Sequence, residues 1–592
     1  MRIRLHRSVV LTALLLTLSP LHCRAIDPGP PPQVVQSINQ GLSDQELQQW
    51  YHLSAGTQLI PYDWLVALLD DSLTKTFTVT GLIEDRNHPD KLPVGFAKIN
   101  GPDGTVAQVG FTCSFCHTTQ FTYNKQSIRI EGGPSLQNNS TLVRALVQRL
   151  GALTPPDMPA FLKSLKELSP PEPFKTFATR VLSSRGEAMT AYTLTALAQD
   201  VRKLTYGLVL RSGRDPSPEL WGPGRFDALG RGGNTVFAQL NPDNLRPANA
   251  PVSIPPLWGV WEYDWVQWAG SIQHPLARNI GQVIGVNAGL FDWAQRGGAP
   301  PSDKRKVFRS SIDGNSLTIL ENLARHLPPP QWPSAFPAID RELAARGKDL
   351  YHGNKAKGIP NLCAHCHLPA KLPTSSDGGP SLQITMVPLQ EIGTDSLYLE
   401  NFSQRTVDMS RLGRGRVSAR EASEYLTSEL MSMTDAAKDP SYRDRPNVWR
   451  DTAQYIARPH LAVWATPPFL HNGSIPTLYE LLSPARERRT CFVLDPNMEF
   501  DPEKAGVVAG DCPIPPQLPS APPRLDFRTT WPGNSNRGHE FTNTPDCDST
   551  KSNGVLGCEL PVEDRLAIIE YLKTCDLDRL ILPNPPVCRN FD

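Results

Sequence analysis

The amino-acid sequence predicts a mainly α-helical fold with extensive loops, divided into two domains of similar architecture. The chain has 592 residues, enough for two or more domains that each bury a core. It contains 58 Pro and 42 Gly, which favours long ordered loops around short helices, because apolar residues for cores remain abundant. Helical periodicity occurs at residues 341–353 and 560–574. A C-x-x-C-H motif occurs twice, at residues 113–117 and 363–367.

The N-terminus carries a basic stretch followed by an apolar run, which is typical of a secretory signal peptide. Small residues at Cys23 and Ala25 suit a cleavage site, so residues 1–25 are predicted to be removed and the mature chain to begin at Ile26. The alternative is a membrane anchor, but the apolar run is shorter than the ~20 residues that cross a bilayer. We therefore expect a periplasmic or secreted protein with no membrane span in its mature chain.

The overall charge argues against two classes of partner. Lys and Arg total 59, and Asp and Glu also total 59, so the net charge is zero. Nucleic acid and anionic membrane surfaces select proteins with a basic field. We therefore expect neither of them as a partner.

The eleven cysteines fall into three groups. One lies in the leader, four lie in the two C-x-x-C-H motifs, and six lie between Cys491 and Cys588. An exported chain can form disulfides, and six cysteines can pair in fifteen ways. Because short loops close most readily, we predict the nearest-neighbour pairs. These are Cys491 with Cys512, Cys547 with Cys558, and Cys575 with Cys588.

The strongest chemical signals are FTCSFCHTTQ at residues 111–120 and NLCAHCHLPA at residues 361–370, which are both c-type haem attachment sequences. In each, the two cysteines can form thioethers to the haem vinyl groups, and the adjacent histidine can bind the iron as proximal ligand. A zinc or C-x-x-C redox site is the alternative, but zinc would need further ligands at close spacing. The sequence thus predicts two covalently bound haem c groups. Their attachment residues are Cys113, Cys116 and His117 for haem 1, and Cys363, Cys366 and His367 for haem 2.

The predicted domains follow from the surroundings of these motifs. The helix at 341–353 leads into the second motif, and the amphipathic helix at 560–574 would cross it near the chain end. Residues 337–592 are therefore predicted to form a C-terminal domain for haem 2, with disulfide-bearing loops. Residues 26–336 would form the N-terminal domain for haem 1, with a helical segment at 45–71 before the motif.

A short repeat links the two predicted domains. The sequence GGPSL occurs at residues 132–136 after the first motif and at 378–382 after the second. It suggests a duplication, although five residues of turn-forming composition can also recur by chance.

Four longer segments carry a family resemblance. They are RFDALGRGGNT (225–235), PVSIPPLWGVWEYDWVQWAGSIQHPLARNIG (251–281), PPFLHNGSIPTLYELL (467–482) and NSNRGHEF (534–541). From about residue 40 to the C-terminus, the chain resembles the di-haem cytochrome c peroxidase superfamily. It is most similar to the branch that contains the rubber oxygenases.

This resemblance implies two cytochrome c-like haem domains and a peroxidase-like oxidoreductase. Hydrogen peroxide would be reduced at an open haem 1, and a six-coordinate haem 2 would relay electrons from a small redox protein or other donor. The alternatives are a dioxygen-dependent alkene oxygenase of the rubber type, oxidative maturation of a partner protein, and a non-enzymatic electron-transfer cytochrome. A charged acid/base pair around haem 1 would favour peroxide, and a lining of Phe, Trp and Ala would favour oxygenation. The resemblance also allows a calcium ion between the haem domains.

A six-coordinate haem 2 needs a second strong ligand. The histidines available after the second motif are His460, His471 and His539. The resemblance favours His539, in NSNRGHEF, because His471 lies in an LHNGS motif that is usually structural in the superfamily. Classical di-haem peroxidases place a methionine ligand soon after that motif, but here LYELLSPARERRT has no Met and Met498 lies further on.

Around haem 1, the Trp-rich segment 257–281 is the best source of pocket residues. Its tryptophans, Trp258, Trp261, Trp265 and Trp268, have offsets of three and four. This spacing fits a helical core stripe, and it also fits a Trp between the haems, for which Trp265 is the favoured candidate.

Further along the same segment, His274 and Arg278 could act as base and hydrogen-bond donor to bound peroxide, with Gln267 and Asn279 in similar roles. The alternative is a surface histidine beside an ion pair. Trp265, His274 and Arg278 are thus the predicted catalytic residues.

Overall fold

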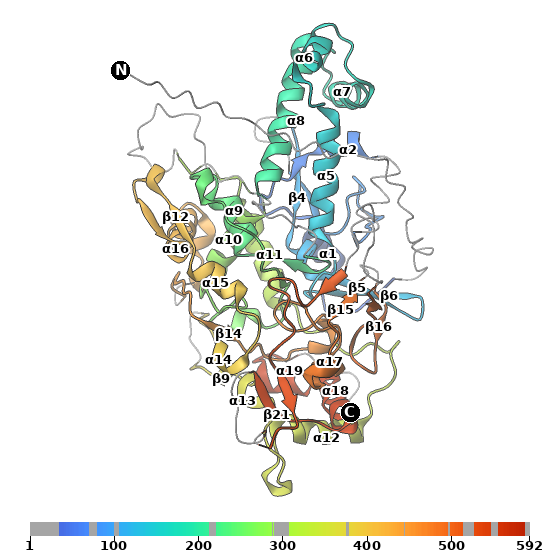
Figure 1. The fold of residues 1–592 in the computed structure, drawn as a ribbon, viewed down its shortest axis with the longest axis vertical. Coiled ribbons are helices and arrows are strands. Elements are labelled where there is room, and N and C mark those ends of the chain that lie inside the picture. The colour runs from blue at the N-terminus through green and yellow to red at the C-terminus, as the bar shows by residue number, and fades with distance from the viewer. Residues whose placement is uncertain are drawn as a thin grey trace, which may run out of the picture.

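The computed structural model of the chain describes residues 35–69, 80–99, 106–211, 221–286, 288, 307–308, 310–373, 378–442, 445–494, 498–512, 526–545, 547 and 554–585. The predicted signal peptide, residues 1–25, and the predicted disulfide partner Cys588 lie outside these residues. Figure 1 shows α5, α6, α7 and α8 projecting at the top, and α12 and α18 lying at the opposite end. No helix of the described part is long and apolar enough to cross a membrane.

Before residue 337, helices and short strands alternate along the chain. The helices are α1 (Asp44–His52), α2 (Tyr62–Leu68), α4 (Cys113–His117), α5 (Asn139–Leu153), α6 (Met158–Lys166), α7 (Glu172–Ser184), α8 (Ala191–Arg211), α9 (Gly230–Phe237), α10 (Pro275–Gly285) and α11 (Gly314–His326). The strands are β1 (Val35–Ser37), β2 (Ile60–Pro61), β3 (Phe96–Ile99), β4 (Gln108–Phe111), β5 (Thr118–Tyr123), β6 (Gln126–Glu131), β7 (Arg225–Phe226) and β8 (Val252–Ser253). They form the sheets β1-β6-β5, β2-β4-β3 and β7-β8.

After residue 337, shorter elements are joined by long loops. The helices are α12 (Arg341–His352), α13 (Ala364–His367), α14 (Leu389–Ile392), α15 (Leu397–Ser403), α16 (Ala419–Met431), α17 (Leu478–Leu482), α18 (Val562–Lys573) and α19 (Asp576–Ile581). The strands are β9 (Ala370–Lys371), β10 (Leu382–Gln383), β11 (Met386–Pro388), β12 (Thr406–Asp408), β13 (Arg416–Ser418), β14 (Gln454–Ile456), β15 (Cys491–Val493), β16 (Phe500–Asp501), β17 (Gly506–Val507), β18 (Gly510–Asp511), β19 (Asp526–Arg528), β20 (Glu540–Thr542) and β21 (Val555–Cys558).

The helices predicted at 341–353 and 560–574 are confirmed as α12 and α18, and they cross each other. Their crossing needs a glycine, because a Cβ at Gly347 would lie 1.8 Å from the carbonyl oxygen of Ala567. Tyr351 and Tyr571 are fully buried beside the crossing and belong to the largest hydrophobic core. Close backbone approach and aromatic burial together position the second C-x-x-C-H motif, which follows α12.

The helical segment predicted at 45–71 is interrupted. The structure divides it into α1 and α2, with strand β2 between them. Gly56 has a φ of 106°, and a Cβ there would lie 2.0 Å from the carbonyl oxygen of Ser311. The chain therefore leaves the helical conformation here in order to pass against another segment, a long-range contact that local periodicity does not show.

The first motif leads directly into a β-hairpin that the sequence patterns did not predict. Strands β5 and β6 pair antiparallel from Thr118↔Glu131 to Tyr123↔Gln126. Asn124 and Lys125 connect them with φ angles of 49° and 65°, as expected for a two-residue hairpin turn. The hairpin carries the chain back past His117, so the motif is anchored by a sheet and not only by helices.

The four tryptophans of the Trp-rich segment do not lie on one helix, so its interpretation as a helical core stripe is wrong. Between Trp258 and Trp268 the segment contains one short 3-10 helix, Val260–Glu262, and turns, and α10 begins after them at Pro275. Gly259 and Gln267 have left-handed φ angles of 68° and 70°, which break helical continuation on both sides. Trp258 and Trp261 are nevertheless buried, in two different hydrophobic cores.

Two of the three predicted disulfides are confirmed. Cys491 pairs with Cys512, and Cys547 pairs with Cys558. Cys575 is also disulfide-bonded. The first bond joins the start of β15 to the residue that follows β18, and the second joins residue 547 to the end of β21.

Candidate functional site

The first C-x-x-C-H motif lines a large cavity, called here the first motif cavity. Cys113, Cys116 and His117 lie on the short helix α4, and Thr112 caps that helix by accepting a hydrogen bond from the Ser114 amide at 3.3 Å. The empty space, including its open mouth, is about 1480 Å³.

The motif side chains are electrically neutral in this cavity. Burial raises the pKa of Cys113 to about 11 and that of Cys116 to about 12, so both free thiols stay protonated. Burial, assisted by the charges of Arg278 and Arg458, lowers the pKa of His117 to about 3. Among the described residues its Nδ1 has no hydrogen-bond partner, although the Pro255 carbonyl is close enough to oppose the shift. A neutral imidazole is the form that binds a metal.

Helices α9 and α10 form a wall of this cavity and explain the glycines of the GRGG sequence. A Cβ on Gly285 would lie 3.3 Å from the Cα of Gly232, so the two helix backbones approach closely. Gly232, Gly233, Gly281 and Gly285 all line the cavity. Small residues here leave room for a flat group against the backbone.

Most of the remaining lining is apolar. It includes Phe226, Phe237, Phe402, Leu426 and Trp449. Within the described residues, no Asp or Glu lines the cavity and no histidine other than His117 does so.

The lining also carries polar side chains, among them Thr57, Thr112, Ser423 and Thr427. Arg278 brings the one charged side chain of the described lining, and its guanidinium donates to Asn279 Oδ1 at 3.0 and 2.6 Å. Burial lowers the pKa of Arg278, and the carboxylate of Glu321 opposes this shift. Gln267, which also lines the cavity, has a strained left-handed φ of 70°. Such strain is often found at functional sites.

The other two predicted catalytic residues lie outside this lining. His274 is buried, caps α10 by accepting from the Ala277 amide at 3.3 Å, and stacks on Tyr442. Burial lowers the pKa of His274 to about 4, so it is not the surface histidine of the alternative interpretation. Trp265 is covered by the guanidinium of Arg450 at 3.6 Å and lines neither motif cavity.

The second C-x-x-C-H motif lines a separate cavity, called here the second motif cavity, with a similar empty space of about 1480 Å³. His367 ends helix α13, and its Nδ1 donates to the carbonyl oxygen of Arg458 at 2.7 Å. Burial lowers the pKa of His367 to about 4, so the imidazole is neutral and its Nε2 lone pair is available. A backbone acceptor on one ring nitrogen is the usual way to orient a histidine that binds metal through the other.

The spacing of imidazoles in the second motif cavity suits iron between two of them. The ring centroids of His367 and His539 lie 6.3 Å apart. Metal–nitrogen bonds of about 2.0 Å and a nitrogen-to-centroid distance of about 1.1 Å would place two axial imidazoles about 6.2 Å apart. His460 instead stacks face to face on His367 at 3.8 Å, which is too close for ligands on opposite sides of one iron. The geometry therefore fits a haem c with His539 opposite His367.

The remaining candidates have other roles. His471 uses both ring nitrogens, Nδ1 with Thr394 Oγ1 at 3.4 Å and Nε2 with the Tyr455 hydroxyl at 3.1 Å. Met498 is buried in the largest core and does not line the second motif cavity.

The loop that presents His539 is clamped by a buried arginine. Arg488 donates to the backbone carbonyls of Asn536, Gly538 and His539 at 2.7, 2.8 and 2.6 Å. His539 has a left-handed φ of 50°, and its Nδ1 is buried without a hydrogen-bond partner in the described structure. Burial lowers its pKa to about 3, which keeps the ring neutral. A strained, neutral and clamped imidazole is well prepared for metal binding.

A thin partition separates the two motif cavities. Ser253 and Ile254 line both of them, Pro255 lines the first, and Pro256 lines the second. Trp268 lines the second cavity, and its Nε1 donates to the Ser253 carbonyl at 2.8 Å. Trp268 therefore has the place beside the partition that the sequence pattern predicted for Trp265.

Sequence reasoning missed Arg458, which lies in the second motif cavity and also touches the partition through Pro256. It has no local motif that could have revealed it.

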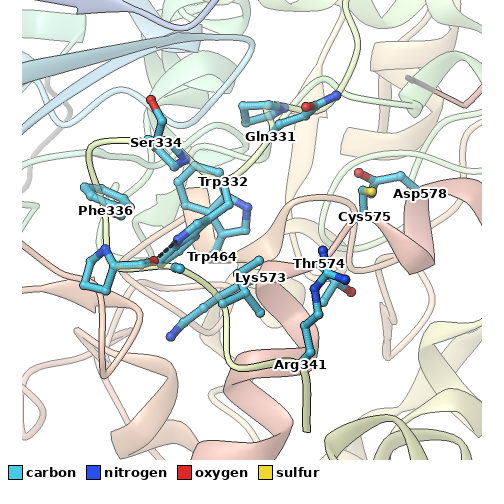
Figure 2. A pocket seen from close by; sticks show the side chains of 15 residues that line it. Gln331, Trp332, Ser334, Phe336, Arg341, Trp464, Lys573, Thr574, Cys575 and Asp578 are labelled. Carbon is cyan, nitrogen blue, oxygen red and sulfur yellow. Dashed lines mark hydrogen bonds between the residues drawn. The ribbon is translucent and has the colours of Figure 1, made fainter. Parts of the chain in front are cut away.

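A third cavity lies apart from both motifs. Figure 2 shows its lining, with Lys573 beside Trp332 and Trp464, and with Cys575 and Asp578 to the right of them. Its empty space is about 860 Å³, including the opening. Asp578 is buried, and among the described residues its Oδ1 has no hydrogen-bond partner.

Asp578 is expected to make stability depend on pH. Burial raises the pKa of Asp578 to about 8, opposed by the Ala462 amide, so the folded chain binds more protons than the unfolded chain between about pH 4 and pH 8. The free energy of unfolding should therefore fall as pH rises through this range. Asp578→Asn should remove the dependence and be about 1–3 kcal/mol more stable than the parent at pH 8. Urea unfolding at pH 5 and pH 8 measures this.

The matched control is Asp576→Asn on the same helix. Asp576 forms a partly exposed ion pair with Lys348, which contributes little to stability. It should leave the pH profile close to that of the parent. A parallel pH profile for Asp578→Asn and the parent would contradict a buried, protonated carboxyl group.

Comparison with known proteins gives two kinds of similarity. Residues 454–493 match a family described as RoxA-like, cytochrome c-like. The chain is 31% identical over 609 residues to "Uncharacterized protein y4iJ" of Sinorhizobium fredii, covering 91% of this chain and 92% of that protein. It is 27% identical over 287 residues to "Uncharacterized protein y4iM" of the same organism, covering 46% of this chain and 53% of that protein.

Proposed function

We propose, from the premise that this chain belongs to one family with y4iJ of Sinorhizobium fredii, that it is a di-haem c-type cytochrome acting as an oxidoreductase. The RoxA-like, cytochrome c-like segment implies covalently bound haem c and relates the chain to the rubber oxygenases. Its disulfides suit an oxidising compartment, which supports a periplasmic or secreted location.

In this proposal each motif cavity holds one haem c. Cys113 and Cys116 would attach haem 1, with His117 as its proximal ligand. Cys363 and Cys366 would attach haem 2, and His367 and His539 would be its axial ligands. The 6.3 Å spacing of the last two imidazoles supports a six-coordinate haem 2. Among the described residues, no group of His, Cys, Asp and Glu is arranged as a cation site, so calcium stays a prediction from the resemblance.

Haem 1, when bound, would supply an open iron position for an oxidant. The side chains that line the first motif cavity would determine whether hydrogen peroxide or dioxygen reacts there. Peroxide reduction needs a side chain that moves a proton. The described lining of the first motif cavity has no Asp, no Glu and no second His.

The apolar walls of the first motif cavity are the observation that carries the assignment. The sequence favoured hydrogen peroxide, and the cavity supports the alternative more strongly. We assign the protein as a dioxygen-dependent oxygenase of an apolar, alkene-containing substrate. Both oxygen atoms would enter the two carbonyl products of the cleaved double bond, so no external electrons are needed. Phe237, Phe402 and Trp449 would bind the hydrocarbon and exclude water.

Peroxide reduction is the second candidate, because Arg278 lines the same cavity. A guanidinium can stabilise charge that develops on a bound oxidant. Gln267 and Asn279 could add hydrogen bonds. Trp265 and His274, which line neither cavity, would act only indirectly in either reaction.

The test compares the two oxidants on the purified protein. With a short cis-polyisoprene oligomer, we expect dioxygen uptake matched by carbonyl products, one dioxygen for two carbonyl groups. Phe402→Tyr places a hydroxyl in the apolar cavity and should lower kcat/KM for the oligomer about tenfold, the effect of an unpaired buried hydroxyl. Phe308→Tyr is the matched control, because Phe308 is buried in the same hydrophobic core but does not line the cavity.

The opposite pattern would support the second candidate. That pattern is no uptake with the oligomer, and rapid consumption of hydrogen peroxide with a reduced cytochrome as donor. Consumption of neither oxidant, with no carbon monoxide binding in the reduced protein, would leave only the electron-transfer cytochrome.

A further inference from the structure

A short route of two hydrogen bonds and one close approach connects the two proximal histidines across the partition. His367 donates from Nδ1 to the carbonyl oxygen of Arg458 at 2.7 Å. The Arg458 guanidinium, through Nη2, donates to the carbonyl oxygen of Pro256 at 2.7 Å. Pro256 follows Pro255, and the Pro255 carbonyl faces His117 in the first motif cavity. The route from one histidine to the other therefore uses one arginine and one proline pair.

The two ends of this route have the same local sequence pattern. Each has a residue followed by proline, Pro255–Pro256 in the first half and Arg458–Pro459 in the second. In each, the carbonyl before the proline approaches the proximal histidine of its own motif. The Arg458 side chain joins the two segments, because its guanidinium donates a hydrogen bond to the Pro256 carbonyl oxygen.

The surroundings of Arg458 argue that it is not kept for stability alone. The residue is 8% exposed, and in the described part of the chain no carboxylate pairs with it. Its guanidinium lies 5.7 Å from the centroid of Tyr263 and 5.8 Å from that of Trp268. Burying an arginine that has no carboxylate partner lowers the stability of the fold, so we expect this side chain to serve the function of the protein.

We propose that Arg458 is the positioning residue that couples the two haems through their proximal histidines. The inference rests on the proposed di-haem function. With haem c bound at both motifs, one electron would pass from the reduced haem 2 to the oxidised haem 1, with no bond made or broken. His367, the Arg458 backbone and guanidinium, and the Pro256–Pro255 pair form the route to His117. The initial electron comes from an external reductant such as ascorbate or a small redox protein.

The experiment measures electron transfer between the haems in Arg458→Met and Arg458→Lys. Carbon monoxide is photolysed from the half-reduced protein, and the transfer is followed optically. Arg458→Met keeps the carbonyl that orients His367 but removes the bond to Pro256, so the rate should fall by about an order of magnitude. Arg458→Lys keeps one donor and should recover part of the rate. Arg450→Met is the matched control, because Arg450 donates to the Gly270 carbonyl and lines neither cavity.

Several results would overturn the proposal. An unchanged rate in Arg458→Met would do so, as would a fall only in Trp268→Phe. A haem 2 that becomes high spin in both Arg458 variants would show that the arginine holds an axial ligand and does not couple the haems. Haem content and reduction potentials separate these failures from that of the proposed function. One haem per chain in the parent would refute the di-haem assignment itself, whereas two haems with an unchanged rate would refute only the coupling.

Discussion

Replacing His539 with Ala should convert one of the two haems completely from low spin to high spin. Two imidazoles at the iron give a strong ligand field, and the substitution removes one of them. The His367–His539 spacing of 6.3 Å and the clamp of Arg488 on the 536–539 loop are the reasons for this expectation. Electronic and electron paramagnetic resonance spectra of the ferric protein measure the change. We also expect the altered haem to bind carbon monoxide when reduced.

His471→Ala and His460→Ala are the matched controls. Both remove an imidazole that lines the same cavity, so they report the effect of perturbing the pocket without removing the proposed ligand. His471 is engaged at both ring nitrogens, and its loss should lower stability but leave the spin state unchanged. A low-spin haem 2 in His539→Ala, together with a high-spin haem in either control, would transfer the axial role to that histidine.

The double substitution Cys113→Ala with Cys116→Ala should halve the haem content of the chain and abolish carbon monoxide binding. The two thiols supply both covalent attachments, and without them His117 alone would have to retain haem 1. The haem that remains would be the six-coordinate haem 2, which has no open position. Pyridine haemochrome content per chain and the carbon monoxide difference spectrum of the reduced protein measure the two effects.

The reciprocal pair, Cys363→Ala with Cys366→Ala, provides the control. It should also halve the haem content, but the remaining haem should still bind carbon monoxide. If carbon monoxide binding instead disappears with the second pair and survives with the first, the open haem is the one that we place in the second motif cavity. Equal binding in both double variants would mean that neither haem is fully six-coordinate.

The structure offers two candidates for the residue that couples the two motif cavities, Trp268 and Arg458. A Trp between the haems is an attractive electron route, and Trp268 lies beside the partition. Its indole, however, is hydrogen-bonded to the Ser253 carbonyl and not to either proximal histidine. Arg458 accepts from His367 through its carbonyl oxygen and donates to the Pro256 carbonyl through its guanidinium, which makes the arginine the better candidate for coupling.

The sequence by itself determined the features that depend only on residues close together in the chain. The two C-x-x-C-H motifs place both cysteines and the histidine within one turn of chain, so any fold that keeps the turn keeps the set together. Helices α12 and α18 follow from their apolar periodicity. The disulfides Cys491–Cys512 and Cys547–Cys558 close short loops, which is why nearest-neighbour pairing found them.

Tertiary structure alone decided the rest, because the deciding contacts join segments far apart in the chain. His539 meets His367 from a distant loop, and only the fold of that loop under Arg488 distinguishes it from His471. The first motif cavity combines α4, α9, α10 and α16, so its lack of a described acid/base side chain cannot be read from any one segment. Left-handed backbone at Gly259 and Gln267 interrupts the Trp-rich segment, since burial of Trp258 and Trp261 in separate cores outweighed local helical spacing.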